Sequence, residues 1–396
     1  MRPPTNTMNL INAATNGIPL PAMLQRGQVL GGVNARSIRV ESLNAKLKAP
    51  FPIASDRSKK GAIKNALIVA DDYEGHVGLG EAAPFRGIAG DTHEALLRDM
   101  ALHSSSFSLV RWGDLVSMDE PLPAARAALE MAHLDMLSRV HGEGLYKFLN
   151  PEAEAQAFET DITIPLVGSQ RAEALARDYL QRGFGRVKVK VGDDAELSEA
   201  RVAAVHDIFK KGGVRFDILI DANEGFSAEQ STGLLDALAR RDIPVKIFEQ
   251  PVERGDLDGM ALVRERAHEL GALVFADESV FTVADAIKAI EAGATDGINL
   301  KLMKHGGFVE ALRIAELAQK AGLRLMVGGM VETRLAMSAG LHLALAIGDV
   351  SWIDLDTPLL LEEELFEGGL RYDGPMVIPP EGPGIGVKLK VGTELV

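Results

Sequence analysis

The sequence predicts an α/β protein in which a parallel β/α barrel follows an N-terminal α+β region. From about residue 158 onward, short apolar segments typical of buried strands alternate with longer segments of helical periodicity. Eight such strand segments occur over roughly 200 residues, as in a barrel whose parallel strands are joined by crossover helices. Before residue 150 the strands come first and the helices follow, which is the order of an α+β domain.

The N-terminal region begins with a segment that we expect to lie outside the fold. Residues 1–35 are rich in Asn, Pro, Gly and Thr and make a poor signal peptide, so we predict a loose extension. The antiparallel strands and the helices that follow are predicted at residues 37–43 and 66–70, and at residues 92–100 and 124–140. Residues 36–155 are therefore predicted to form the α+β domain.

The barrel is predicted over residues 156–359. Its strands are expected at residues 160–165, 186–191, 217–221, 245–249, 273–277, 297–302, 324–328 and 352–356. Helices are expected between them at residues 171–182, 199–211, 230–241, 257–270, 283–292 and 308–321. No clean eighth helix follows residue 356, and the Pro- and Gly-punctuated tail, residues 360–396, is predicted to return to the first domain.

Composition excludes several classes of partner and chemistry. The 396 residues are 46% hydrophobic and 25% charged, as in ordinary soluble proteins, and the net charge of −14 argues against nucleic acid or an anionic membrane surface. The chain has no cysteine, so neither disulfides nor thiolate chemistry is possible. No apolar run reaches the roughly 18 residues of a membrane span, and we expect a cytoplasmic protein.

Two lysines, Lys188 and Lys190, lie in a run of valines and point to the same face of the predicted strand. Neighbouring like charges disfavour each other's protonation, so at least one of the two amines is expected to have a pKa below the usual value of about 10.4. Such a lysine can act as a base near neutral pH. An exposed edge strand with two solvated lysines is the alternative for this stretch taken alone.

Charged residues also end the strands that follow. Lys190, Asp221, Glu249, Asp277 and Lys301 are separated by 31, 28, 28 and 24 residues, which by subtraction is about one β/α unit each. Any one of them could be a helix cap or a solvated side chain, but five in register predict a site at one rim of the barrel. The three carboxylates would repel one another without a cation, and oxygen ligands of this kind suit Mg²⁺.

These motifs resemble those of the enolase superfamily, in its muconate-lactonising subgroup. The matching segments are Lys-x-Lys, Asp-Ala-Asn, Glu-Gln-Pro, Asp-Glu-Ser and Asn-Leu-Lys-Leu-Met-Lys-His-Gly-Gly, and the resemblance runs from about residue 37 to the C-terminus. It implies a modified (β/α)₇β barrel, similar to a TIM barrel, with an α+β capping domain built from the N-terminal region and the C-terminal tail. That architecture agrees with the missing eighth helix.

The resemblance also implies roles for the rim residues. Asp221, Glu249 and Asp277 would hold one Mg²⁺ per subunit, with Mn²⁺ as a substitute, and the ion would stabilise the charge that develops when a proton is removed next to a carboxylate. Lys190 and Lys301 would exchange that proton on opposite faces of the substrate, and Lys188 would lower the pKa of Lys190. A small-molecule dipeptide substrate and a homo-oligomer are the expected partners.

Asp354 and Asp356 distinguish between reactions within the subgroup. They lie at i and i+2 on the last strand, again at the rim, and a pair of acids without a lysine nearby in sequence suits a cationic group. The pair resembles the Asp-x-Asp motif of dipeptide epimerases, which binds the substrate's α-ammonium group, and Thr163 matches a threonine that contacts substrate. Taken alone, the pair could equally be a cap and a solvated acid.

Further contacts are predicted around this site. Arg57, Lys59 and Lys60 form a basic cluster that could accept the γ-carboxylate of glutamate, with Arg86 in a second loop as another candidate, although both loops could simply be solvated. Asn223 is predicted to contact the metal ligands and Glu278 to contact Lys301, with surface roles equally open.

The sequence therefore predicts a Mg²⁺-dependent dipeptide epimerase that acts through an enediolate on a dipeptide such as L-Ala-D/L-Glu from murein. An N-acyl amino acid racemase or a muconate-type cycloisomerase of the same subgroup is the alternative enzyme. A non-catalytic barrel used for binding or assembly is the alternative from another class.

Overall fold

An eight-stranded parallel barrel forms the larger part of the protein. The computed structural model describes residues 35–54, 61–84, 91–107 and 122–393. The barrel strands, in sheet order, are β5 (Ile162–Ile164), β6 (Arg186–Lys190), β7 (Asp217–Asp221), β8 (Ile247–Glu249), β9 (Leu273–Ala276), β10 (Gly297–Leu300), β11 (Arg324–Gly328) and β12 (Trp352–Asp354). A parallel bridge between Thr160 and Ile353 joins the first and last strands, so the sheet closes on itself. The predicted barrel is confirmed.

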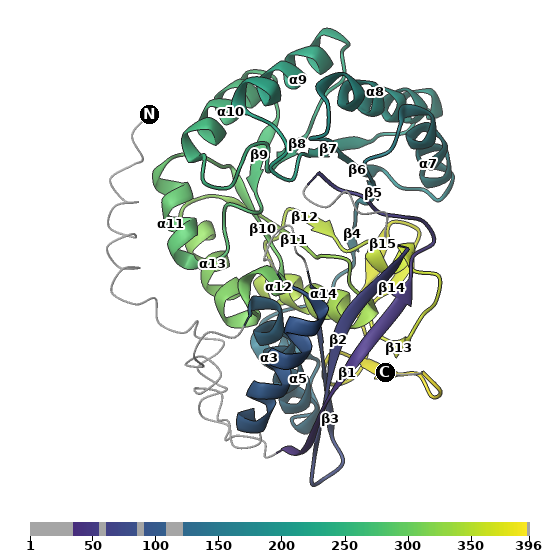
Figure 1. Ribbon diagram of the computed structural model, residues 1–396, viewed down its shortest axis with the longest axis vertical. Coiled ribbons are helices and arrows are strands. Elements are labelled where there is room, and N and C mark those ends of the chain that lie inside the picture. The colour runs from purple at the N-terminus through teal and green to yellow at the C-terminus, as the bar shows by residue number, and fades with distance from the viewer. Residues whose placement is uncertain (1–34, 55–60, 85–90, 108–121, 394–396) are drawn as a thin grey trace.

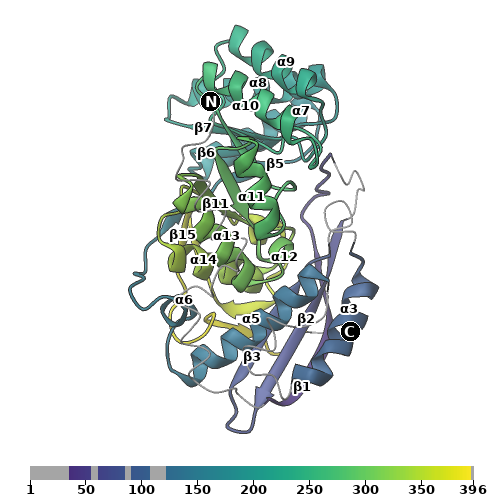
Figure 2. The same cartoon turned by 90° about the vertical axis from the view of Figure 1, so that its left-hand side faces the viewer.

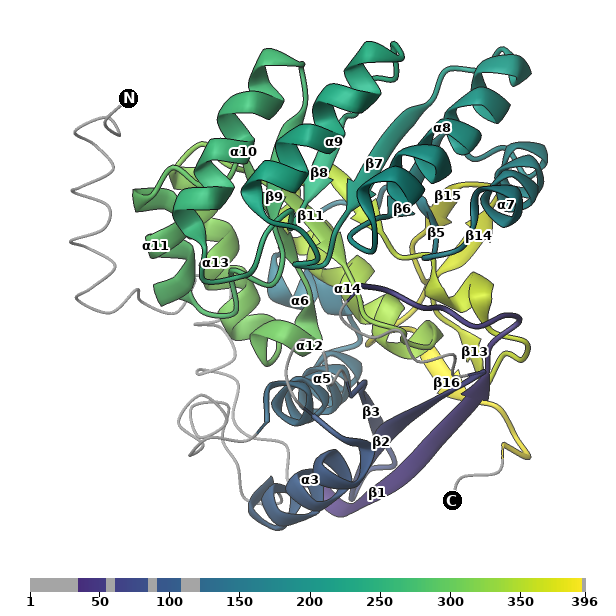
Figure 3. The ribbon, with the colours of Figure 1, turned by 45° about the horizontal axis from the view of Figure 1, so that its top comes forward.

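Helices surround the strands, as Figure 3 shows. They are α7 (Ser169–Gln181), α8 (Ala195–Gly212), α9 (Ala228–Arg240), α10 (Leu257–Glu269), α11 (Val283–Glu291), α12 (Leu302–His305), α13 (Phe308–Lys320) and α14 (Arg334–Ile347). Only the short 3₁₀ helix η1 (Thr357–Leu360) follows β12 in the described part of the chain, which gives the (β/α)₇β pattern.

A separate antiparallel sheet caps one end of the barrel (Figures 1 and 2). Its strands are β1 (Ala35–Lys46), β2 (Ala62–Asp72) and β3 (Val77–Ala82), and the helices α3 (His93–Phe107), α5 (Pro123–Val140) and α6 (Leu145–Leu149) follow them. The strands are longer than predicted because backbone pairing between β1 and β2 continues beyond the apolar residues that mark the core.

The tail after β12 forms short strands that contact both parts of the molecule. They are β13 (Phe366–Gly368), β14 (Arg371–Asp373), β15 (Met376–Ile378) and β16 (Val387–Leu389), with β15 pairing to β4 (Phe158–Glu159). On the capping side, Asp135 of α5 accepts a hydrogen bond from the backbone N–H of Ile385 at 2.6 Å, and Arg139 donates to the carbonyl of Val387 at 2.8 Å. These contacts lie where a returning tail is expected.

The structure differs from the sequence prediction in the bounds of several barrel strands and in one helix. The strand predicted at residues 297–302 ends at Leu300, and α12 begins at Leu302. Helix α14 was not predicted, because its residues are apolar almost all round and so lack the one-sided pattern of a surface helix. It is buried between barrel and cap. In the described part of the chain, no helix has the length and apolarity needed to cross a membrane.

The contact between β3 and α5 depends on two glycines. A Cβ atom at Gly80 would lie 1.9 Å from the carbonyl oxygen of Ala128, and one at Gly78 would lie 2.1 Å from that of Ala132. The absence of side chains on this face of β3, together with alanines on α5, allows the helix backbone to approach the sheet directly.

We therefore expect Gly80→Ala to lower the free energy of unfolding by about 3 kcal/mol, because the clash involves backbone that cannot rotate away. Gly233→Ala is the matched control: Gly233 is exposed on α9 with nothing within 4 Å of its Cβ position, and alanine there should stabilise the protein by up to about 1 kcal/mol. Urea unfolding of both variants tests this. Equal stability of the two would contradict the close approach.

Candidate active site

The charged residues of the site form the layer above an apolar layer inside the barrel. Leu219, Ile247, Phe275, Met326 and Trp352 make a buried cluster of their own. Four of these positions lie two residues before an acid, namely Asp221, Glu249, Asp277 and Asp354. Because side chains in a strand alternate between faces, each acid points to the same side as the apolar residue below it. The strands thus place these acids at the carboxyl end of the barrel.

The strand order places the two rim lysines on opposite sides of the predicted metal ligands. Lys190 ends β6 and Lys301 follows β10, and β7, β8 and β9 lie between them in the sheet. The amine of Lys190 lies 2.5 Å from Asp221 Oδ2, and that of Lys301 lies 2.6 Å from Asp277 Oδ2. Both lysines line the same cavity, so each can face a bound molecule.

Lys188 lies below them and is buried, with 1% of its surface exposed. Its amine contacts Glu249 Oε2 at 2.7 Å and Asp354 Oδ2 at 2.5 Å, so it joins β6 to β8 and β12 across the barrel interior. This placement excludes the alternative of an exposed edge strand with solvated lysines.

The sequence predicts a lowered pKa for at least one of Lys188 and Lys190, and the pKa of Lys188 is a raised one. Burial by itself lowers it, but Asp354, Glu249 and Asp161 together raise the pKa well above the usual value. The pKa of Lys301 is also raised: burial lowers it, and Asp277 more than compensates. The acids that raise these two pKa values come from other strands, and they outweigh burial.

The predicted metal ligands are completely buried at neighbouring strand ends, and each contacts a lysine. Asp221 pairs with Lys190, Glu249 with Lys188 and Asp277 with Lys301. In this arrangement their oxygens do not gather into a set within 4.8 Å of one another; among the described residues only Asp161, Asp354 and Asp356 do so. The assignment of Asp221, Glu249 and Asp277 as metal ligands stays a prediction.

The donor set around these acids nevertheless fits a hard divalent cation. Asn223 Nδ2 donates to Glu278 Oε1 at 3.0 Å, and the backbone N–H of Asn223 donates to Asp221 Oδ1 at 2.9 Å. Asn223 Oδ1 and Glu278 Oε2 are buried and accept no hydrogen bond from any described residue. Buried oxygens with free lone pairs beside three carboxylates match the ligand chemistry of Mg²⁺.

Two further residues at these acids were missed by the sequence reading. Lys304, on α12, donates to Asp277 Oδ1 at 2.8 Å and to the carbonyls of Asp277 and Asn299 at 2.6 and 2.8 Å. Asn299 Nδ2 donates to Glu249 Oε1 at 2.6 Å. Lys304 lies one helical turn after Lys301. Had a helix been predicted directly after Leu300, this spacing would have placed Lys304 on the same side as Lys301.

Asp354 and Asp356 lie on the wall of the same cavity, together with Thr163. Asp356 Oδ2 accepts a hydrogen bond from the backbone N–H of Thr163 at 2.7 Å, which ties the end of β12 to β5. Burial raises the pKa of Asp356 to about 7, with a further contribution from Asp354. No lysine lies near Asp354 in the sequence, but the fold brings Lys188 to it from β6.

The cavity has a volume of about 580 Å³ and lies between the cap and the end of the barrel. Its barrel side carries Lys190, Lys301 and the acid pair, whereas much of its capping side is apolar. Apolar residues of the capping side include Leu47, Phe51, Ile53 and Ile63. The predicted side-chain contacts Arg57, Lys59, Lys60 and Arg86 lie outside the described residues.

Fold and site together define a capped β/α-barrel protein with lysines on either side of a buried acid cluster. The family described as Enolase C-terminal domain-like matches residues 171–392. The chain is 36% identical over 357 residues to the hydrophobic dipeptide epimerase of Citrifermentans bemidjiense, which covers 87% of this chain and 95% of that protein.

Solved structures agree with this assignment. A substrate complex of the L-Ala-D/L-Glu epimerase from Bacillus subtilis has a TM-score of 0.83 and 29% identity, covering 89% of this chain and 98% of that one. The dipeptide epimerase of Enterococcus faecalis with Mg and L-Leu-L-Tyr has a TM-score of 0.82 and 29% identity, covering 90% and 99%. The chain belongs to the enolase superfamily.

We expect Lys188→Met, measured in the presence of a chelator, to lower the free energy of unfolding by about 3–5 kcal/mol, because Glu249 and Asp354 are left without their buried countercharge. The loss should shrink as the pH falls, since unpaired carboxyls take up protons. Urea unfolding at several pH values tests this. Lys210→Met, at an exposed position on α8, is the control and should change stability little. A Lys188→Met variant as stable as this control would show that the ion pairs are not important for folding.

Proposed function

We propose that the protein is a Mg²⁺-dependent dipeptide epimerase that inverts the α-carbon of the C-terminal residue of its substrate. One observation carries the proposal: two lysines face a single cavity from opposite sides of an acid cluster, and the acid pair Asp354 and Asp356 lies on the wall of that cavity. Several proteins similar to this chain have names that specify epimerisation of dipeptides, including hydrophobic dipeptides and L-Ala-D/L-Glu.

Asp221, Glu249 and Asp277 would hold the metal ion. A magnesium ion supplies positive charge beside the substrate carboxylate, which stabilises the enediolate formed when the α-proton is removed. A structural neighbour contains Mg together with a dipeptide, and Mn²⁺ is proposed as a substitute.

The proton transfers fall to Lys190 and Lys301. Because they approach the cavity from β6 and from the end of β10, a planar intermediate between them presents one face to each amine. One lysine removes the proton from its face in the neutral form, and the other returns a proton to the opposite face in the charged form. Inversion requires both, since a single amine would return the proton to the side from which it came. Lys188, which lies below them, is proposed to contribute a positive charge to the site.

Asp354 and Asp356 are proposed to bind the α-ammonium group of the dipeptide. Ammonium binding at a partly desolvated carboxylate pair is strong because the charges are poorly screened. The backbone N–H of Thr163 donates to Asp356 Oδ2, and this hydrogen bond would hold the carboxylate in position for the ammonium group. A substrate that lacks an amino group, as for the acyl racemase alternative, would leave the pair without a partner.

The C-terminal side chain of the dipeptide is proposed to lie against the capping side of the cavity. The apolar residues Leu47, Phe51, Ile53 and Ile63 suit a hydrophobic side chain, whereas Arg57, Lys59 and Lys60 are retained as candidates for binding the carboxylate of glutamate. We also propose that the substrate derives from murein and that the protein is cytoplasmic and homo-oligomeric. The proposed domain boundaries are 36–155 and 156–359.

Incubation with L-Ala-L-Glu, L-Leu-L-Tyr and a library of L,L-dipeptides in ²H₂O should show deuterium at the α-carbon of the second residue and appearance of the L,D-product. NMR and mass spectrometry measure both. Chelation should abolish the exchange and Mg²⁺ should restore it. Lys190→Ala and Lys301→Ala should each abolish epimerisation, while exchange from the one configuration served by the remaining lysine persists. Absence of exchange with every dipeptide, combined with turnover of N-acyl amino acids, would favour the racemase alternative.

Asp354→Ala should raise KM for dipeptides by about tenfold or more, because one of the two charge-assisted contacts to the ammonium group is lost. Circular dichroism and steady-state kinetics on the same preparation separate this effect from misfolding. Asp285→Ala, in a capping box at the start of α11, is a control that also removes a carboxylate and should leave KM unchanged. A variant with normal KM would remove Asp354 from the ammonium-binding site.

A further inference from the structure

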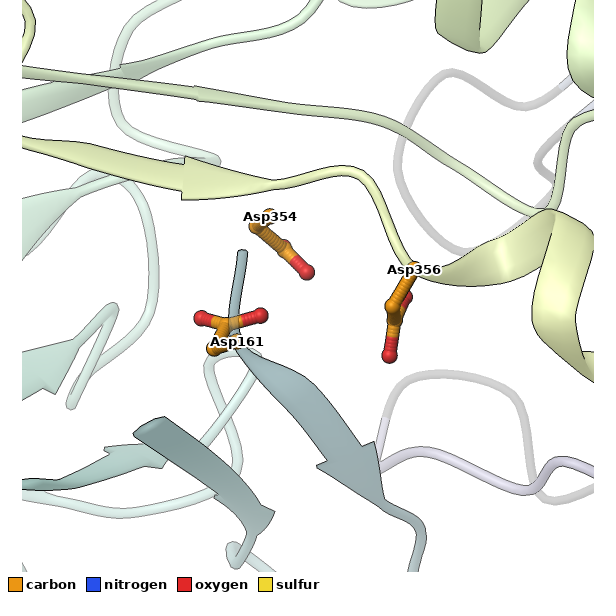
Figure 4. A group of neighbouring side chains, drawn as sticks. All are labelled: Asp161, Asp354 and Asp356. Carbon is orange, nitrogen blue, oxygen red and sulfur yellow. The ribbon is translucent and has the colours of Figure 1, made fainter. Parts of the chain in front are cut away.

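Asp161 is a buried acid that lies behind the Asp354–Asp356 pair and has no assigned role. It is completely buried and is not part of the cavity wall. Figure 4 shows its carboxyl group beside that of Asp354, and oxygens of Asp161, Asp354 and Asp356 all lie within 4.8 Å of one another. Asp161 precedes Thr163 by two residues, so strand alternation directs both side chains to the same side. That spacing is the sequence signal that could have revealed it.

The backbone holds Asp161 in this place. Its N–H donates to the carbonyl of Ile353 at 3.0 Å, and the N–H of Leu355 donates to Thr160 Oγ1 at 3.0 Å. These bonds lie at the bridge that closes the barrel, on either side of Asp354. The backbones that carry Asp161 and Asp354 are therefore held side by side.

No N–H or O–H group of the described residues donates to either carboxyl oxygen of Asp161. The hydrogen bond open to this side chain is one with the carboxyl group of Asp354, and two carboxyl groups can bond only if one of them carries a proton. A buried acid without any hydrogen bond would be costly, so this shared proton is the arrangement that satisfies both groups.

The surrounding charges decide which acid is protonated. Lys188 contacts Asp354 at 2.5 Å, and although burial raises the pKa of Asp354, Lys188 and Lys301 lower it below the usual range. Burial, and then the charge of Asp354, raise the pKa of Asp161 well above its usual range; Lys188 opposes this and Asp356 adds to it. Asp161 is thus the neutral donor and Asp354 the charged acceptor.

We propose that Asp161 is a positioning residue of the ammonium-binding site, where its carboxylic acid donates a hydrogen bond to Asp354 and fixes the orientation of that carboxylate. This inference rests on the proposed function of Asp354 and Asp356. Lys188 contacts Asp354 Oδ2 at 2.5 Å, a hydrogen bond from Asp161 would hold the same carboxylate from a second side, and Asp354 lies on the cavity wall. A neutral Asp161 also adds no negative charge, which leaves the pair suited to a single ammonium group.

Kinetics of Asp161→Ala and Asp161→Asn test the proposal, since the asparagine amide can still donate to Asp354. The ligands are the L-Ala-L-Xaa dipeptide that the wild-type protein epimerises and N-propionyl-L-Xaa, the same molecule without its amino group, used as an inhibitor. Asp161→Ala should raise KM for the dipeptide by about tenfold while kcat and the inhibition constant change less than about threefold. Asp161→Asn should stay within about threefold of wild type in all three quantities.

A general disturbance of the site would weaken both ligands equally, and that result overturns the proposal. An asparagine variant as impaired as the alanine variant overturns it too, because donation to Asp354 would then not be the function of Asp161. The kcat value and the inhibitor separate positioning of the ammonium-binding pair from a merely structural role.

Crystal structures of the wild-type protein and the two variants decide the proposal independently of turnover. The Asp354 side chain should keep its orientation in Asp161→Asn, with the amide nitrogen within hydrogen-bond distance, and should turn in Asp161→Ala. An amide that points away from Asp354, or an Asp354 that is unmoved in the alanine variant, overturns the inference. If no dipeptide is epimerised, the proposed function fails, while these structures still show whether Asp161 orients Asp354.

Discussion

Charge compensation inside the barrel is the constraint on which the rest of the site depends. Lys188 is almost completely removed from solvent and lies between Glu249 and Asp354, which come from strands on either side of it in the barrel. A buried lysine or carboxylate without a partner would cost several kcal/mol, so the positions of these side chains are fixed by their need for one another. The same contacts raise the pKa of Lys188, which keeps it positively charged and suits it to balance the acids.

The barrel fold places these charged side chains on defined sides of the cavity. Strand alternation places an apolar layer below and an acid layer above, and the sheet order sets Lys190 and Lys301 on opposite sides of the acids. The cap then closes the cavity from above. It is tied to the barrel by Glu81 of β3, which accepts hydrogen bonds from Thr333 and Ala336 at the start of α14 and from Asn65 of β2. A substrate in the cavity is therefore held between two parts that are fixed relative to each other.

Some residues of the site could be predicted from the sequence, and others could not. The strand ends that carry Lys190, Asp221, Glu249, Asp277 and Lys301 were predictable, because β/α units have a regular length and charged residues interrupt apolar strands. Asp161 and Lys304 were not predicted, because each is marked only by a short spacing to one predicted residue, Thr163 or Lys301, and not by a repeated pattern. Helix α14 was missed for a related reason: being buried on nearly all sides, it has no polar face to mark its period.

The sequence by itself determined the barrel, the order of its strands and the residue types at their ends, because these follow from local periodicity and from the connections that parallel strands require. Only the tertiary structure decided which charges meet. Lys188 approaches Asp354 across 166 positions of sequence, and Asp161 reaches the same carboxylate through the closure of the barrel. Electrostatic interactions depend on distance in space and on burial, and neither can be read from spacing along the chain. The raised pKa of Lys188 is accordingly explained by its neighbours in the fold and not by its neighbour in sequence.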